Sequence, residues 1–80
     1  MKLDIVSPEK VYFSGDVLLV TLPGESGQFT VLENHAPIIS ALNNGIVSYK
    51  TMSADNSLHI NGGFAEVNNN KVIVCIEKAD

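Results

Sequence analysis

The only imidazole and thiol groups of the chain are the first candidates for chemistry. His35, His59 and Cys75 lie far apart in a sequence of 80 residues. A structural zinc site needs about four ligands at short characteristic spacings, which these three do not offer. Cys75 stands in an apolar run, Val72–Ile76, that favours a buried structural thiol, and His59 is expected to point outward from a strand. The sequence therefore predicts neither a metal site nor a cysteine nucleophile.

The glycine-containing segment Pro23–Gly27 is the second candidate. It is not a phosphate-binding loop, because no Gly-Lys-Ser/Thr follows and residues 28–31 resemble a strand rather than a helix start. It is not a nucleophile elbow either, because the glycines do not flank Ser26 in the required pattern. The nine acidic residues show no spacing typical of a catalytic pair. By itself this segment indicates an exposed turn.

The third candidate is His35, which stands just before an X-Pro step. Pro37 cannot donate to a strand ladder, so we expect an edge or a crossing between sheets at this point. A small hydrolase using His35 as a general base would lack a nucleophile and an orienting partner. Without further information His35 is interpreted as a structural histidine.

Charge and composition exclude several classes of function. The net charge is −4, and the five basic residues are all isolated lysines, so no basic patch is available for nucleic acid. No apolar stretch approaches the roughly 18 residues of a membrane span, and Asp4 and Pro8 interrupt any signal peptide. One cysteine cannot form an internal disulfide, which suits a reducing compartment.

Short β-branched runs separated by turn residues predict the elements that position these side chains. Breakers recur too often for a helix, so the pattern indicates an all-β sandwich or barrel. The run 71–77 is apolar on both faces and is expected to be a central strand. We expect hairpin turns at residues 43–45, 55–56 and 68–70, and a meander of local pairings.

Six segments, taken in their order along the chain, form a specific pattern: Leu3–Glu9, Phe13–Gly15, Pro23–Val31, His35–Ile39, Gly45 and Gly62–Val67. This pattern resembles the N-terminal β-sandwich of the epsilon subunit of F-type ATP synthases. The similarity covers essentially the whole chain. It departs from the family pattern at Gln28, where an acidic residue is common, and at Thr30, Glu33 and Asn34.

The resemblance implies a flattened β-sandwich of about ten strands in two sheets, forming a single domain over residues 1–80. It implies a non-catalytic rotor subunit without a cofactor, which joins the gamma subunit to the c-ring and couples proton flow to ATP synthesis. Such a subunit is peripheral on the cytoplasmic side of the bacterial inner membrane and meets the membrane only through its complex. The helical hairpin of the family would lie beyond Asp80, so the resemblance covers the sandwich without that inhibitory arm.

The resemblance also assigns partner contacts. It places Ser7 and His35 on the side that faces gamma and the c-ring, and the turn formed by Glu25, Ser26, Gly27 and Gln28 against the c-subunit loops. We expect Ile38 and Ile39, held apart from normal pairing by Pro37, to support an apolar contact with gamma.

The alternative is a free-standing β-sandwich that binds a ligand such as a carbohydrate. This alternative is weakened because the chain has no tryptophan and only five aromatic residues, several of which are expected to point into the core. Weak self-association through a bare gamma-facing surface is also expected.

Overall fold

The computed structural model describes residues 1–79, and Asp80 lies outside the described residues. The described chain contains strands and connecting turns and no helix, so the all-β prediction is confirmed. The seven strands are β1 (Lys2–Val6), β2 (Val11–Asp16), β3 (Leu19–Gly24), β4 (Gly27–Leu32), β5 (Ile38–Lys50), β6 (Asp55–Asn68) and β7 (Lys71–Ile76).

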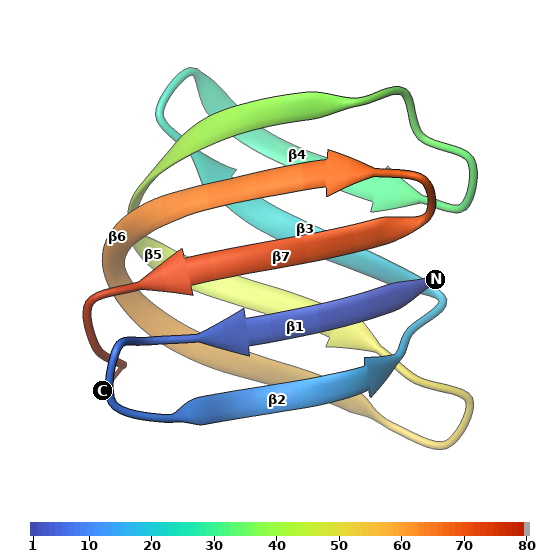
Figure 1. Cartoon of the computed structure of the whole chain (residues 1–80), viewed down its shortest axis with the longest axis horizontal. Helices are drawn as coiled ribbons and strands as arrows, with labels where there is room; N and C mark the ends of the chain where they lie inside the picture. Colours follow the sequence, from blue (N-terminus) through green and yellow to red (C-terminus); the bar gives the residue numbers. More distant parts are fainter. Residues whose placement is uncertain (80) are drawn as a thin grey trace.

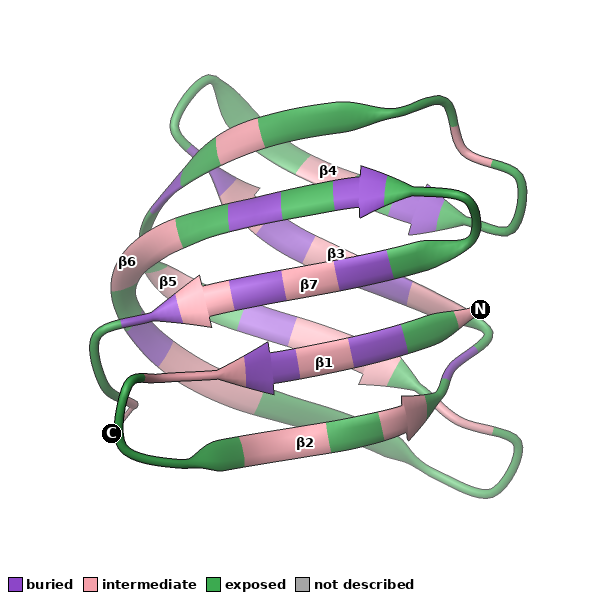
Figure 2. Ribbon diagram, in the orientation of Figure 1, coloured by how far each residue is buried: buried purple, intermediate pink, exposed green. Residues whose placement is uncertain are grey.

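The strands form where apolar residues alternate along the chain. Successive side chains of a strand point to opposite faces, so alternation buries one face of each strand. Leu3 and Ile5 of β1 and Val72 and Val74 of β7 are fully buried, while the residues between them are partly accessible. Figure 2 shows this alternation as purple and pink bands along β1 and β7.

All seven strands belong to one continuous sheet in the order β2-β1-β7-β6-β5-β3-β4, folded over into two layers (Figure 1). The front layer holds β2, β1 and β7 with the second half of β6 and the first half of β5. The back layer holds β3 and β4 with the remaining halves. The expected ten strands in two sheets are therefore only roughly matched, because β5 and β6 each pass through both layers.

Two of the three expected hairpin turns are wrong. Residues 43–45 lie inside β5, and Gly62 and Gly63, which also look like breakers, lie inside β6. The two strands stay paired through this region and bend together from one layer to the other. The expected turn at residues 55–56 is the start of β6, and the connection is residues 51–54.

The turn at residues 68–70 is confirmed. Asn69 and Asn70 have φ angles of 52° and 59°, which asparagine tolerates better than most residues. The central position of β7 is also confirmed, because β7 lies between β1 and β6. The meander is wrong in two respects. The first and last strands, β1 and β7, pair in parallel, and β3 pairs with β5, which leaves β4 at the edge of the sheet.

The two inner faces form a single apolar core. Each strand except β2 contributes at least one residue that is completely inaccessible to solvent. From β2, the Phe13 ring packs on the Tyr49 ring of β5, with ring centroids 4.5 Å apart. Among residues 1–79 no helix has the length and apolar character needed to cross a bilayer.

Candidate partner-binding site

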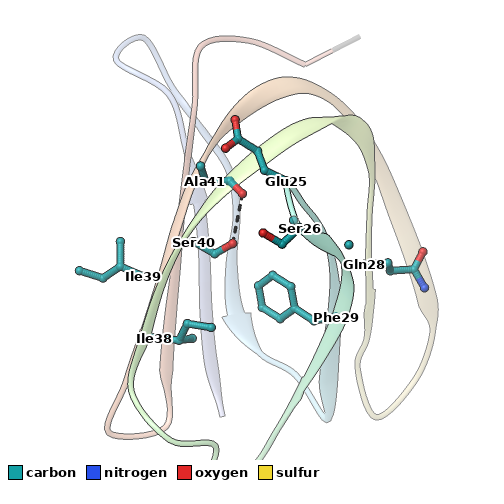
Figure 3. Close-up of a pocket in the computed structure, with 10 residues that line it drawn as sticks. Glu25, Ser26, Gln28, Phe29, Ile38, Ile39, Ser40 and Ala41 are labelled. Atoms are coloured by element: carbon teal, nitrogen blue, oxygen red, sulfur yellow. Dashed lines mark hydrogen bonds between the residues drawn. The ribbon is translucent and has the colours of Figure 1, made fainter.

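A groove of about 490 Å³ lies between the β3–β4 turn and the first half of β5 (Figure 3). Six residues assigned to partner contacts from the sequence line it, although they come from two segments of the chain. They are Glu25, Ser26, Gly27, Gln28, Ile38 and Ile39. The fold therefore brings the turn and the start of β5 into one site.

The turn side of the groove depends on small residues. Gly27 has a φ of 131°, which an L side chain rarely adopts, and a Cβ at Gly24 would come within 2.7 Å of the Gly27 carbonyl oxygen. Pro23 has no N–H to donate, and the β3–β5 register shifts between Thr21 and Gly24 around it. The result is an exposed two-residue tip at Glu25 and Ser26.

On the β5 side, Ile38 and Ile39 point in opposite directions. Ile38 faces the groove beside Phe29 and is 36% exposed, whereas Ile39 points away from the groove and is 74% exposed (Figure 3). Pro37 precedes the strand, and together with Ile38 and Ile39 it lines a second hollow against Glu66 and Val67. The two isoleucines therefore present their side chains on opposite sides of β5, and their expected contact with gamma stays a prediction.

Ser7 and His35 lie at opposite ends of the sandwich. The start of β1 is next to the His35 loop, because the Lys2 N–H donates to the Asn70 carbonyl and the Asn70 side chain is bonded to Asn34. Ser7 follows the other end of β1. One partner surface would have to extend along the molecule to reach both residues.

The Ser7 side chain has a local structural role. Its Oγ accepts hydrogen bonds from the backbone N–H groups of Glu9 and Lys10, each at 3.2 Å, which stabilises the β1–β2 connection. Thr51 does the same in the β5–β6 connection, accepting from Ser53 and Ala54. A hydroxyl residue at the start of a short connection is a sequence signal for this arrangement.

His35 is half-buried in the loop between β4 and β5. Its Nδ1 donates to the Ala36 carbonyl at 2.7 Å, and its backbone N–H donates to the Leu32 carbonyl at 3.2 Å. His59 also has a structural contact, since its Nε2 donates to Asn44 Oδ1 at 2.9 Å. Each histidine thus stabilises local backbone or side-chain structure where the chain turns or bends.

An apolar row that was not expected from the sequence lies on the outer face of the front layer. Cross-strand pairs join Ala41 to Phe64, Phe64 to Cys75, Cys75 to Val6 and Val6 to Val11. Phe64 is 51% exposed and Val11 is 61% exposed. Cys75 is half-buried in this row rather than in the core, which corrects the expectation of a buried thiol. The apolar residues on both faces of β7 were the signal for such a row.

The outer face of the back layer is more polar. Thr21 and Thr30 share a hydrogen bond of 2.8 Å there, and His59 and Asn44 are bonded to each other. On this outer face, β5 presents one exposed aliphatic residue, Ile46, which is 48% exposed. The two outer faces therefore differ in chemistry, and the apolar row is confined to the front layer.

The sequence matches the family model "ATP synthase, Delta/Epsilon chain, beta-sandwich domain" over residues 1–80. The chain belongs to this family. It is 44% identical over 77 residues to the ATP synthase epsilon chain of Chlorobium limicola, a match that spans 95% of this chain and 88% of that protein. It is 42% identical over 80 residues to the epsilon chain of Nitratidesulfovibrio vulgaris strain DSM 19637 / Miyazaki F, spanning all of this chain and 60% of that relative.

Solved structures confirm the sandwich fold of this family member. A chain of the Euglena gracilis mitochondrial ATP synthase, solved as OSCP/F1/c-ring, superposes with a TM-score of 0.90 at 23% identity and covers 98% of this chain and 51% of its own length. A chain of the Tetrahymena thermophila central stalk/c-ring superposes with a TM-score of 0.85 at 13% identity, with coverages of 99% and 64%. At these identities the similarity concerns the fold.

Proposed function

We propose that this chain is a non-catalytic central-stalk subunit of a proton-translocating ATP synthase. In this role it joins the gamma subunit to the c-ring, and torque passes through it without any bond being made or broken. The proposal rests on membership of the delta/epsilon family. The observation that carries it is the presence of two chemically different surfaces, the apolar row and the turn groove, on one small sandwich.

The apolar row is the proposed contact for gamma. Stable interfaces bury about 1,600 Å² in total and have an apolar centre within a polar rim. Phe64 lies between Ala41 and Cys75 in the row, and its aromatic side chain contributes a large contact area. Ile39 extends the apolar surface beside Ala41 on the same face of β5, whereas Ile38 belongs to the groove.

The β3–β4 turn is the proposed contact for the c-ring loops. Glu25, Ser26, Gly27 and Gln28 are all exposed, and the small residues let a partner backbone approach closely. Glu25 supplies a negative charge to this polar tip. A polar contact suits loops that emerge from a membrane ring into water.

The first half of β5 links the two proposed contacts. Ala41 contributes its side chain to the apolar row, and its carbonyl oxygen accepts a hydrogen bond of 2.9 Å from the Glu25 N–H in the turn. Force applied at the turn therefore reaches the gamma-facing layer through a short backbone contact. The assembled subunit would be peripheral on the cytoplasmic side of the bacterial inner membrane and would meet the membrane only through its partners.

A charge placed in the apolar row tests the gamma contact. We expect Phe64→Asp to weaken binding to the gamma subunit of the same ATP synthase at least about tenfold, because a carboxylate would lose its hydration in the interface. Ile46→Asp is the matched control, since Ile46 is 48% exposed on the opposite layer and Phe64 is 51% exposed. Its affinity should stay within about twofold of the wild type.

Isothermal titration calorimetry with purified gamma measures both affinities, and circular dichroism verifies that both variants are folded. Equal affinities of the wild type and the Phe64 variant for gamma would show that gamma does not bind this face. A loss of affinity in the Ile46 variant alone would move the contact to the back layer. Analytical ultracentrifugation of the same proteins tests the proposed weak self-association, which Phe64→Asp should abolish.

A further inference from the structure

The turn groove is an open seam in the sheet. The described residues of β4 pair only with β3, and the first half of β5, Ile38–Leu42, pairs with β6. Both strands also line the groove, so two strand edges face it across Phe29 (Figure 3). Exposed edges present N–H and C=O groups that can pair with another extended chain.

The hydrogen-bonding pattern of β5 shows which of its backbone groups face the groove and could pair with another chain. The Ala41 carbonyl points toward the turn, because it accepts from the Glu25 N–H. Backbone groups of alternate residues in a strand point the same way, so the N–H and C=O of Ile39 also face the groove. Those of Ser40 face β6, where Ser40 pairs with Ala65.

The groove is closed at both ends of the seam. The Glu25–Ala41 hydrogen bond closes one end, and the loop of residues 33–37, held by the His35 N–H to Leu32 carbonyl bond, closes the other. Between them β5 lines the groove with residues 38–41, a stretch of roughly 13 Å at about 3.3 Å per residue. A long continuous strand does not fit this space, but the tip of a loop does.

Charge limits the occupant further. Glu25 is the only charged residue among those that line the groove, and the chain as a whole carries a net charge of −4. A lysine or arginine next to the extended tip would pair with Glu25 at the rim. Phe29 is half-buried in the floor and offers an apolar surface to a small side chain of the tip.

We propose that this seam receives the extended tip of a c-ring loop, which pairs with the Ile39 backbone and places a basic side chain beside Glu25. The proposal rests on the function proposed above and specifies how the c-ring is gripped. Backbone pairing gives a slip-resistant contact that depends little on the partner's side chains. The basic residue determines the direction in which the tip enters.

Amide hydrogen exchange of the wild-type chain, read by NMR with and without the purified c-ring in nanodiscs, tests the pairing directly. The Ile39 amide should exchange quickly in the free chain and at least about tenfold more slowly in the complex, because a new hydrogen bond forms. The Ser40 amide is the internal control, since it is bonded to β6 in both states. An Ile39 amide that stays unprotected in a formed complex would overturn the proposal.

Two substitutions at one position separate backbone from side chain. Ile39→Pro removes the N–H at an edge position that tolerates proline, whereas Ile39→Ala keeps the N–H and removes the exposed side chain. We expect the proline variant to bind the c-ring about tenfold more weakly than the alanine variant. Glu25→Gln should weaken binding severalfold and reduce its dependence on salt.

The outcomes distinguish this proposal from the function on which it rests. Normal binding by the proline variant, with binding lost on Ser26→Trp in the turn, would keep the c-ring contact but exclude strand pairing. Normal binding of the c-ring by all these variants would show that the c-ring does not contact this turn, and would overturn the proposed contact itself. Protection of the Ile39 amide that rises with protein concentration in the absence of the c-ring would assign the seam to a second copy and overturn the proposal.

Discussion

Tyr49 shows how one side chain connects the two layers. Its ring stacks on Phe13 from the opposite layer, with the ring planes tilted by 45°. Burial raises the pKa of the Tyr49 phenol above its usual value of 10.0. The folded chain therefore keeps this proton at alkaline pH values at which the unfolded chain has lost it.

This difference predicts a loss of stability at high pH. The contribution of Tyr49 is fully present below pH 10 and is lost as the pH rises through the pKa of the folded state, because only the unfolded state then gains from ionisation. Urea unfolding at about pH 8 and about pH 11 measures it. Tyr49→Phe should lose less unfolding free energy than the wild type between the two pH values. Equal losses of unfolding free energy in both proteins would show that Tyr49 does not cause the loss of stability at high pH.

At the scale of elements, the bend of β6 decides how the sheet folds into two layers. Gly62 and Gly63 have φ angles of 108° and 144°, which other residues rarely adopt. A Cβ at Gly63 would also collide with the carbonyl group of Cys75 on the neighbouring strand. The bend therefore requires glycine at residue 63 for both conformation and space.

We expect Gly63→Ala to lower the free energy of unfolding by about 2–5 kcal/mol, since backbone strain and a clash with the main chain add together. Gly15→Ala is the control within the same sheet, because its Cβ would meet only the edge of the movable Phe13 ring at 3.2 Å. That variant should lose less than about 1 kcal/mol. Urea denaturation of both proteins measures the difference. Similar losses would show that the bend can be formed without this glycine.

At the scale of the whole molecule, stability depends on one small core shared by both layers. A chain of 80 residues buries a limited fraction of its surface, so little stability is in reserve. Ile60 illustrates this, because it is fully buried in β6 and lies opposite Gly45 of β5. Truncation of Ile60 is therefore expected to leave a cavity in this core.

Ile60→Ala should lower the free energy of unfolding by about 2–5 kcal/mol, and Ile60→Val by about 0.5–1.5 kcal/mol. Chemical denaturation of the isolated chain measures both. If added gamma binds as proposed above, it should restore part of the loss, because a partner that binds only the folded state stabilises that state. A loss below about 0.5 kcal/mol for the alanine variant would mean that the core relaxes around the cavity.

Features that depend on neighbouring residues in the chain were predictable from the sequence. The run of apolar residues identified β7 as a central strand, the three asparagines identified the 68–70 turn, and the order of short motifs identified the family. The segments 43–45 and 55–56, rich in asparagine with a glycine or an aspartate, were misinterpreted as turns. Such residues permit either a reversal or a bend, and only pairing with a distant strand selects between them.

Long-range pairing decided the rest. The parallel contact of β1 with β7, the apolar row through Phe64 and the seam between β4 and β5 all join segments that are distant in sequence or face each other only after the sheet folds. The sequence by itself determined which residues prefer strands, which residues permit either a turn or a bend, and which family the chain resembles, because these depend on local periodicity and motif order. Only the tertiary structure decided which edges remain open and which side chains share a face, because both depend on the register of strands brought together by the common core.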